Sequence, residues 1–266
     1  MDKNWQISQK GKIPKLNKPI MVEGLPGIGN VGKVSVDFLI DELNAVKLYE
    51  INSYHFPHSV FVNEDNLVEL PIIDVFYKKF NDKRNDLLLV GGDVQPVDEA
   101  SSYEFSDKML ELLRKFSGTE AITLGGIGLA EIPKKPRVFC TGNSKEIIKK
   151  YSAEDVNQKL YGIVGPIIGV SGLLVGMAGK HDIKAVSLLA ETYGHPLYLG
   201  IKGAKEILKV LNSRLRLNIN LNKLDQEIKN VEAEIIKKTE QLNEVSKAIA
   251  IRKLGKRLGS ETDYIG

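Results

Sequence analysis

The sequence has 266 residues, of which 42% are hydrophobic and 27% are charged, enough to bury one substantial core and to carry an appendage. Its formal net charge of +3 is too small to indicate a nucleic-acid partner. The single cysteine, Cys140, excludes an internal disulfide and a cysteine-rich metal site. Because Met1–Gln9 is polar and has no apolar signal core, we expect a cytoplasmic protein.

Composition divides the chain into four segments. Residues 1–18 form an N-terminal segment, residues 19–202 a core, residues 203–258 a helical arm, and residues 259–266 a flexible tail. In the core, short apolar runs alternate with amphipathic stretches, which is typical of an α/β sheet. The predicted fold class is therefore α/β, a three-layer αβα core with a largely parallel sheet, followed by a C-terminal helical or coiled-coil arm.

The predicted strands are the short apolar runs of the core: Pro19–Glu23, Val46–Ile51, Val60–Val62, Leu67–Ile73, Leu87–Val90, Ala121–Leu124, Val138–Thr141, Gly162–Val164 and Ala185–Ala190. The predicted helices are amphipathic stretches: Gly29–Leu43, Glu99–Phe116 and Ser144–Lys150. The run DLLLVGG over Asp86–Gly92 is typical of a central strand covered on both faces. We expect residues 56–80 to add antiparallel strands.

One segment has the length of a membrane span. Leu160–Gly179 carries no charged residue over twenty positions, as a transmembrane helix requires. It also contains six glycines and Pro166, which punctuate elements of soluble proteins. We therefore predict a buried strand, a tight turn and a short helix here, with no membrane partner.

The strongest local motif is EGLPGIGNVGK, Glu23–Lys33, which follows a predicted strand and opens a predicted helix. Gly27, Gly29 and Gly32 have the GxGxxG spacing of a dinucleotide-binding turn. Glu50 ends the next predicted strand, near where a ribose-binding carboxylate would lie. The pattern therefore leaves a nucleoside- or nucleotide-binding enzyme open as an alternative function.

The same glycines have a purely structural interpretation. Together with Gly24, they permit a sharp strand-to-helix turn to pack closely. A P-loop is excluded because Val34 stands where a magnesium-binding hydroxyl is required. We favour the structural interpretation and predict no cofactor.

Other polar residues do not form a recognisable catalytic or metal-binding set. The four histidines, His55, His58, His181 and His195, lack metal-ligand spacing. The carboxylates after the strand that ends at Gly92 occupy a position where α/β enzymes place function; they are Asp93, Asp98 and Glu99. They also suit the cap and first turn of a helix, which we favour. We predict no catalytic residue and no metal site.

The arm has a regular apolar seam. From Ala204 to Leu254 it contains neither glycine nor proline. Apolar residues recur in alternating steps of four and three, a period of 3.5 that Lys238 interrupts at one position: Leu217, Leu221, Leu224, Ile228, Val231, Ile235, Leu242, Val245 and Ile249. Such a seam must pack on another helix, from the same chain or from a second copy. We expect a homo-oligomer, with a helix lying on the core as the alternative.

Four motifs, in this order, resemble the proteasome assembly chaperone 2 family, in particular its archaeal PbaA and PbaB type: EGLPGIGNVGK, LLLVGGDVQP, TLGGIGLAEIPKKPRVFCTGN and GPIIGVSGLLVGMAGKHDIKAVSLLAETYG. The resemblance spans about Pro19 to Gly194. It implies a nucleoside-phosphorylase-like αβα core without demonstrated catalysis, oligomerisation, and binding to α-subunits of the 20S proteasome. It also implies that the glycine motifs chiefly determine the fold.

The resemblance further implies a binding role for the tail. In the family, the tail ends in a hydrophobic residue, tyrosine and any residue, and it inserts between α-ring subunits. Here Tyr264 is third from the end, one position away from that pattern. Tyr264 and Ile265 offer an apolar anchor and the Gly266 carboxylate a charge for a lysine; the alternative is a frayed terminus. The function we expect is a non-enzymatic proteasome assembly chaperone or proteasome-binding adaptor.

Overall fold

The computed structural model describes residues 4–152, 156–157, 165–195, 198–226 and 228. The chain divides into two compact units, Met1–Leu221 and Asn222–Gly266. The predicted strand Gly162–Val164, most of the apolar seam and the tail 259–266 lie outside the described residues. The fold below is that of the first unit.

A nine-stranded mixed sheet forms the centre of this unit, in the order β1-β3-β6-β7-β2-β8-β11-β9-β10. Its strands are β1 Trp5–Gln9, β2 Ile20–Glu23, β3 Val46–Ser53, β6 Ile73–Lys78, β7 Leu87–Gly92, β8 Glu120–Leu129, β9 Val138–Gly142, β10 Val156–Asn157 and β11 Lys184–Tyr193. The four central strands β7, β2, β8 and β11 are parallel. Strands β1, β3 and β6 extend the sheet in antiparallel pairs beside β7. On the other side, β9 is antiparallel to β11.

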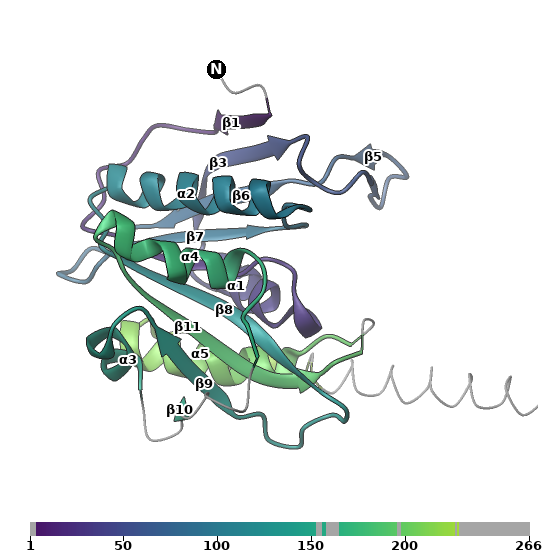
Figure 1. The fold of residues 1–266 in the computed structure, drawn as a ribbon, viewed down its shortest axis with the longest axis vertical. Coiled ribbons are helices and arrows are strands. Elements are labelled where there is room, and N and C mark those ends of the chain that lie inside the picture. The colour runs from purple at the N-terminus through teal and green to yellow at the C-terminus, as the bar shows by residue number, and fades with distance from the viewer. Residues whose placement is uncertain (1–3, 153–155, 158–164, 196–197, 227, 229–266) are drawn as a thin grey trace, which may run out of the picture. The chain divides into compact units, whose positions relative to one another are not determined.

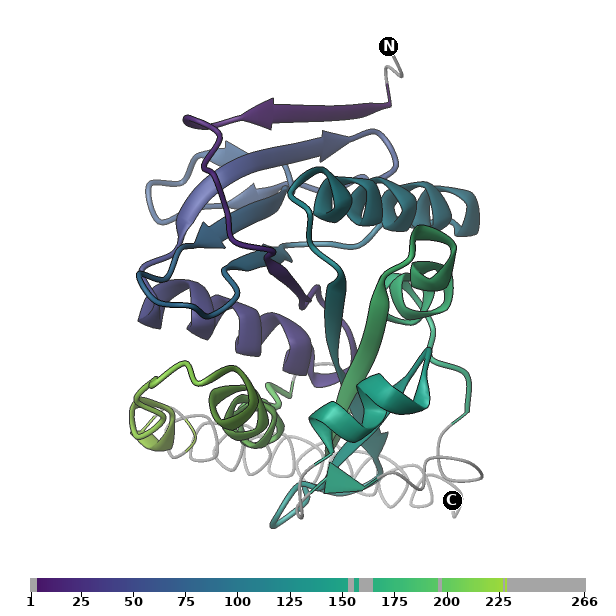
Figure 2. The ribbon, with the colours of Figure 1, turned by 90° about the vertical axis from the view of Figure 1, so that its left-hand side faces the viewer.

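Helices cover both faces of the sheet (Figure 1). Helices α2 (Glu99–Lys115) and α4 (Val170–Ala178) pack together on one face, and α1 (Val31–Glu42) and α5 (Ile201–Leu215) on the other. Figure 2 shows the two pairs on opposite sides of the strands. Helix α3 (Lys145–Tyr151) packs beside β9. The predicted three-layer αβα class is confirmed.

Local sequence explains the main elements. The apolar run Leu87–Val90 is at most 1% exposed, as expected of a strand covered on both faces. Helix α2 begins where the Asp98 carboxylate accepts the Ser101 N–H at 2.9 Å. It buries one stripe on the sheet, which includes Phe105, Met109 and Leu113.

Two predicted elements differ from the structure. The single strand predicted over Leu67–Ile73 is wrong: β5 (Val68–Glu69) pairs with β4 (Phe61–Val62) in a separate hairpin, and β6 begins only at Ile73. Pro71 lies between them and has no N–H for a ladder. Strand β1 was not predicted, because four of its five residues are exposed and its sequence is mostly polar.

The beginning of the predicted arm belongs to the first unit. Residues 203–215 lie in α5, which packs on α1 and β11. The structural division therefore falls after Leu221, whereas the change in composition comes at about residue 203. Among the described residues, no helix is both long enough and apolar enough to cross a membrane. The short helix predicted within the uncharged segment 160–179 is confirmed as α4.

Candidate functional site

All four sequence motifs meet at the edge where the parallel strands end, and the third supplies Leu124–Gly128 of β8. The glycine turn Glu23–Lys33 follows β2, the loop 93–98 follows β7, and the segment 165–169 leads into α4. Between them lies a cavity of about 510 Å³. Its lining is mostly glycine and aliphatic side chains, with Gln95 and Ser171 as its polar members. Ligands of open α/β sheets bind at this edge, so it is the candidate small-molecule site.

Three glycines of the turn are packed against other parts of the backbone or core. A Cβ atom on Gly24 would lie 2.2 Å from the Gly32 carbonyl oxygen. One on Gly32 would lie 2.3 Å from the Leu124 carbonyl oxygen. Gly29 has a positive φ of 60° and would clash with Thr192 Oγ1 at 2.6 Å. These positions require glycine for the fold itself.

Gly27 differs from its neighbours. The nearest atom to a Cβ there would be Gln95 Nε2, at 4.0 Å, and its backbone is extended with a φ of −160°. Gly27 also lines the cavity. Its missing side chain therefore widens the cavity and relieves no close contact.

The geometry does not reproduce a dinucleotide-binding turn. Gly29 has the position that would approach a pyrophosphate, yet it faces Thr192, and its carbonyl accepts the Gly200 N–H at 2.7 Å. Glu50, the candidate ribose ligand, lies on β3, which β6 and β7 separate from β2. Glu50 forms an ion pair with Lys10 at 2.9 Å. The structure therefore does not bring Glu50 to the glycine turn.

Gln95 ties the motifs together. Its side-chain amide donates to the Pro26 carbonyl, and its Oε1 accepts the Val170 N–H at 3.1 Å. One side chain from the loop after β7 thus connects the glycine turn with the first residue of α4. Sequence reasoning included Gln95 in the motif LLLVGGDVQP but assigned it no role.

A buried carboxyl group contacts two residues of the cavity lining, Leu25 and Ser171. Glu23, at the end of β2, has no exposed surface. Its Oε1 accepts the Leu25 N–H at 3.0 Å, and its Oε2 accepts the Ser171 hydroxyl at 2.9 Å. Burial raises the pKa of Glu23 to about 7, because desolvation of the carboxylate outweighs the two hydrogen bonds, which lower the pKa. The pKa of Glu23 therefore lies well above that of an exposed glutamate, a property that residue spacing did not indicate.

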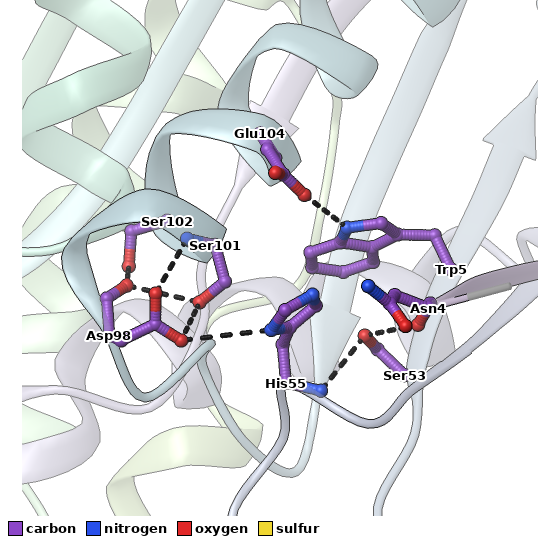
Figure 3. Close-up of polar contacts among 8 residues, drawn as sticks. All are labelled: Asn4, Trp5, Ser53, His55, Asp98, Ser101, Ser102 and Glu104. Atoms are coloured by element: carbon purple, nitrogen blue, oxygen red, sulfur yellow. Dashed lines mark hydrogen bonds and ion pairs between the residues drawn. The ribbon is translucent and has the colours of Figure 1, made fainter. Parts of the chain in front are cut away.

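The polar residues around His55 attach β1 to the rest of the unit (Figure 3). The Trp5 indole N–H donates to Glu104 on α2 at 2.9 Å, and its ring centroid lies 5.5 Å from that of His55. His55 Nδ1 is 3.7 Å from an oxygen of Asp98, the residue that caps α2. Asp98 thus has the capping position expected from the sequence.

The remaining candidates have structural contacts or lie outside the described residues. Asp93 is 3.8 Å from the ammonium group of Lys33 on α1. Among the residues that the structure describes, no group of three or more histidine, cysteine or acidic side chains could hold a metal ion. Tyr264, Ile265 and Gly266 lie outside the described part of the chain.

Comparison with known proteins identifies the family. A family model described as the PAC2 family matches residues 21–239. Among solved structures, Pyrococcus furiosus PbaB, an archaeal proteasome activator, is 35% identical with a TM-score of 0.82, covering 90% of this chain and 99% of that one. Pyrococcus furiosus PbaA, an archaeal homolog of proteasome-assembly chaperone, shares the fold with 24% identity and a TM-score of 0.72, over 98% and 100% of the two chains. The uncharacterized protein MJ1210 of Methanocaldococcus jannaschii is 29% identical over 238 residues, 88% of this chain and 90% of that protein. The chain belongs to the PAC2 family.

Proposed function

We propose that this protein binds the proteasome and acts on it as an activator or assembly chaperone, without chemical turnover, in the cytoplasm. The similarity to the archaeal proteasome activator PbaB carries the proposal, because it combines 35% identity with nearly full coverage of both chains. The packing of Gly24, Gly29 and Gly32 supports it, since these glycines are used by the fold.

The direct test is capture of the 20S proteasome from the same organism by the full-length protein. We expect co-purification of the particle at micromolar concentration. An activator also raises the rate at which the particle hydrolyses a fluorogenic peptide, whereas an assembly chaperone raises the yield of rings from free α-subunits. Absence of capture, of rate change and of yield change together would contradict the proposal.

The tail is the proposed contact with the proteasome α-ring. Tyr264 and Ile265 supply an apolar anchor, and several copies on one oligomer would gain strength through effective concentration. We expect deletion of Tyr264–Gly266 to weaken capture of the 20S particle steeply and to leave the melting temperature unchanged. Thr262→Ala is the matched control. Undiminished capture by the truncated protein would move the contact to the core.

The apolar seam of the arm is the proposed support for self-association. Leu224→Asp with Ile228→Asp places two charges in the seam, and we expect the mass measured by light scattering to fall. Lys229→Asp, outside the seam, is the control. An unchanged mass would show that the seam does not hold copies together.

A nucleoside- or nucleotide-binding enzyme is the second candidate, because the cavity of about 510 Å³ lies against Gly27. Ligand at a hundredfold over its Kd would add about 2.7 kcal/mol to the free energy of unfolding. We expect no thermal shift with ATP, NAD or nucleosides at millimolar concentration. A reproducible upward shift would favour the enzyme.

A further inference from the structure

The β4–β5 hairpin presents apolar side chains to solvent. Five of them are between 45% and 69% exposed: Phe61, Val62, Leu67, Val68 and Leu70. In the part of the chain that the structure describes, the two strands pair only with each other and do not join the main sheet. A two-stranded hairpin is marginally stable alone in water, and a gathered apolar surface of this kind marks an interaction site.

The hairpin is also acidic. Glu64 and Asp65 lie in its turn and Glu69 on β5. In the described part of the chain none of the three forms an ion pair; Glu69 accepts a hydrogen bond from the Asn63 side-chain amide at 2.7 Å. The hairpin therefore presents an apolar surface with uncompensated negative charge, which fits a basic groove with an apolar floor.

The same chain carries such a groove. A cavity of about 720 Å³ lies where the loop 79–86 meets the C-terminal ends of α3 and α5. Five basic side chains line it against the single acidic Asp82: Lys83, Arg84, Lys150, Arg214 and Arg216. Its apolar floor consists of the partly exposed Phe80 and Leu215, which lie with the buried Ile20, Leu87 and Leu217.

Some of these basic groups are already engaged within the chain. Arg84 pairs with Asp82 at 2.7 Å and lies over the Phe80 ring, and Lys150 pairs with Glu120 at 2.5 Å. Arg214 donates a hydrogen bond to the Ser152 carbonyl, whereas Lys83 and Arg216 form no ion pair among the described residues. They are the cations available to an acidic partner.

The hairpin and the groove lie at opposite ends of the strands. The hairpin leads into β6 at Ile73, which is paired with Gly92 at the end of β7. The groove includes Ile20 and Leu87, where β2 and β7 begin. Figure 1 shows β5 beyond the ends toward which β3 and β7 point. Because six residues of β7 span about 20 Å, the hairpin of one chain cannot reach its own groove.

We propose that the β4–β5 hairpin of one copy docks into the basic groove of a second copy, head to tail. The apolar side chains of the hairpin cover the floor of the groove, while Glu64, Asp65 and Glu69 approach Lys83 and Arg216. A contact between two different surfaces repeats from copy to copy, and it closes into a ring when the rotation permits. This inference goes beyond the proposed function and does not depend on the proteasome.

Charge reversal in the full-length protein tests the contact. The hairpin variant is Glu64→Lys/Asp65→Lys/Glu69→Lys, and the groove variant is Lys83→Glu/Arg216→Glu. Each places like charges across the contact, so we expect at least a tenfold loss of self-association, measured by light scattering over a dilution series. The variant that combines all five changes restores opposite charges and is expected to recover the association. Unchanged melting temperatures show that these exposed substitutions leave the fold intact.

Cross-linking tests the geometry independently of any other contact between copies. Asp65→Cys protein mixed with Lys83→Cys protein is expected to form a disulfide-linked pair under mild oxidation, because the native Cys140 is buried. Lys134→Cys, exposed but outside the groove, replaces Lys83→Cys as the control. Failure of the cross-link together with wild-type association of both charge variants would overturn the proposal. Loss of proteasome capture by a hairpin variant that keeps its self-association would also overturn it, and would assign the hairpin to the proteasome.

Discussion

The glycine turn and the β4–β5 hairpin differ in how a sequence motif relates to exposed surface. The turn carries a recognisable ligand-binding pattern, yet Gly24, Gly29 and Gly32 are enclosed by protein atoms. The hairpin carries no motif, yet its apolar side chains are largely exposed. A glycine motif can therefore serve mainly the packing of the fold, since Gly27 alone of the four glycines in the turn leaves room for a Cβ. A surface that is available to a partner is identified by the exposure of its apolar side chains, and that exposure is known only from the folded chain.

The largest effect is expected from one methyl group added to the glycine turn. Gly32→Ala places a Cβ 2.3 Å from the Leu124 carbonyl oxygen. We expect the free energy of unfolding to fall by about 3 kcal/mol, although alanine is intrinsically favoured by about 1 kcal/mol inside a helix. Urea denaturation measures the change, and Gly27→Ala, whose Cβ would only touch Gln95 Nε2 at 4.0 Å, is expected to stay within about 0.5 kcal/mol. Equal effects of the two substitutions would contradict the packing account.

A second test concerns the buried carboxyl group beneath the turn. The folded protein holds the Glu23 proton more tightly than the unfolded chain, since burial raises the pKa from 4.5 to about 7. The stabilising contribution of the proton is therefore complete below pH 4.5 and is lost as the pH rises to about 7. Its size is on the order of 3 kcal/mol, from a rise of roughly 2.5 in the pKa at about 1.36 kcal/mol per unit.

Glu23→Gln isolates this contribution, because the glutamine carbonyl can still accept the Leu25 N–H. We expect the variant to gain stability relative to the wild type as the pH rises from about 4.5 to 7. Chemical denaturation at a series of pH values measures the difference. Glu64→Gln, on the exposed hairpin, is the control and should show no such trend. Parallel pH profiles for Glu23→Gln and the wild type would exclude the proposed titration.

A third test removes the connection between the motifs. Gln95→Ala leaves the Pro26 carbonyl and the Val170 N–H without their side-chain partner. We expect a loss of about 1 to 2 kcal/mol in the free energy of unfolding, the usual cost of unpaired groups that are partly buried. Thermal and urea denaturation measure it, with the exposed Gln6→Ala as the control. A neutral Gln95→Ala would show that the turn and α4 are held independently.

The smallest effect is expected at the hairpin. Val62→Ser with Val68→Ser changes side chains that are 65% and 69% exposed. The two substitutions are made in the groove variant Lys83→Glu/Arg216→Glu, which lacks the proposed docking site. We expect them to change the free energy of unfolding of that variant by no more than about 0.5 kcal/mol. A substantially larger loss would mean that the hairpin supports the fold of its own chain, and the comparison with the glycine turn would fail.

Much of the fold followed from local patterns. The uninterrupted run Leu87–Val90 indicated a central strand, and the stripe of Phe105, Met109 and Leu113 belongs to a helix that was predicted within one residue of its bounds. These patterns predict the elements correctly because burial of one or both faces of a strand or helix sets the spacing of its apolar residues. Strand β1 was missed because its stability depends on pairing with β3, 44 residues away at the Ile7–Ile51 position, and on Trp5 reaching Glu104.

Residue types at short spacings were enough to predict the αβα class, the turn between β2 and α1, and the resemblance to a family. What the glycines do and which polar groups meet depend instead on the folded chain. Gly32 packs against the Leu124 carbonyl, Glu23 accepts a hydrogen bond from the Ser171 hydroxyl, and Gln95 donates one to the Pro26 carbonyl. These partners are brought together by the order of the strands in the sheet, and burial then shifts the pKa of Glu23. Residue spacing carries no information about these contacts or about the pKa of Glu23, since both arise between segments distant in the chain.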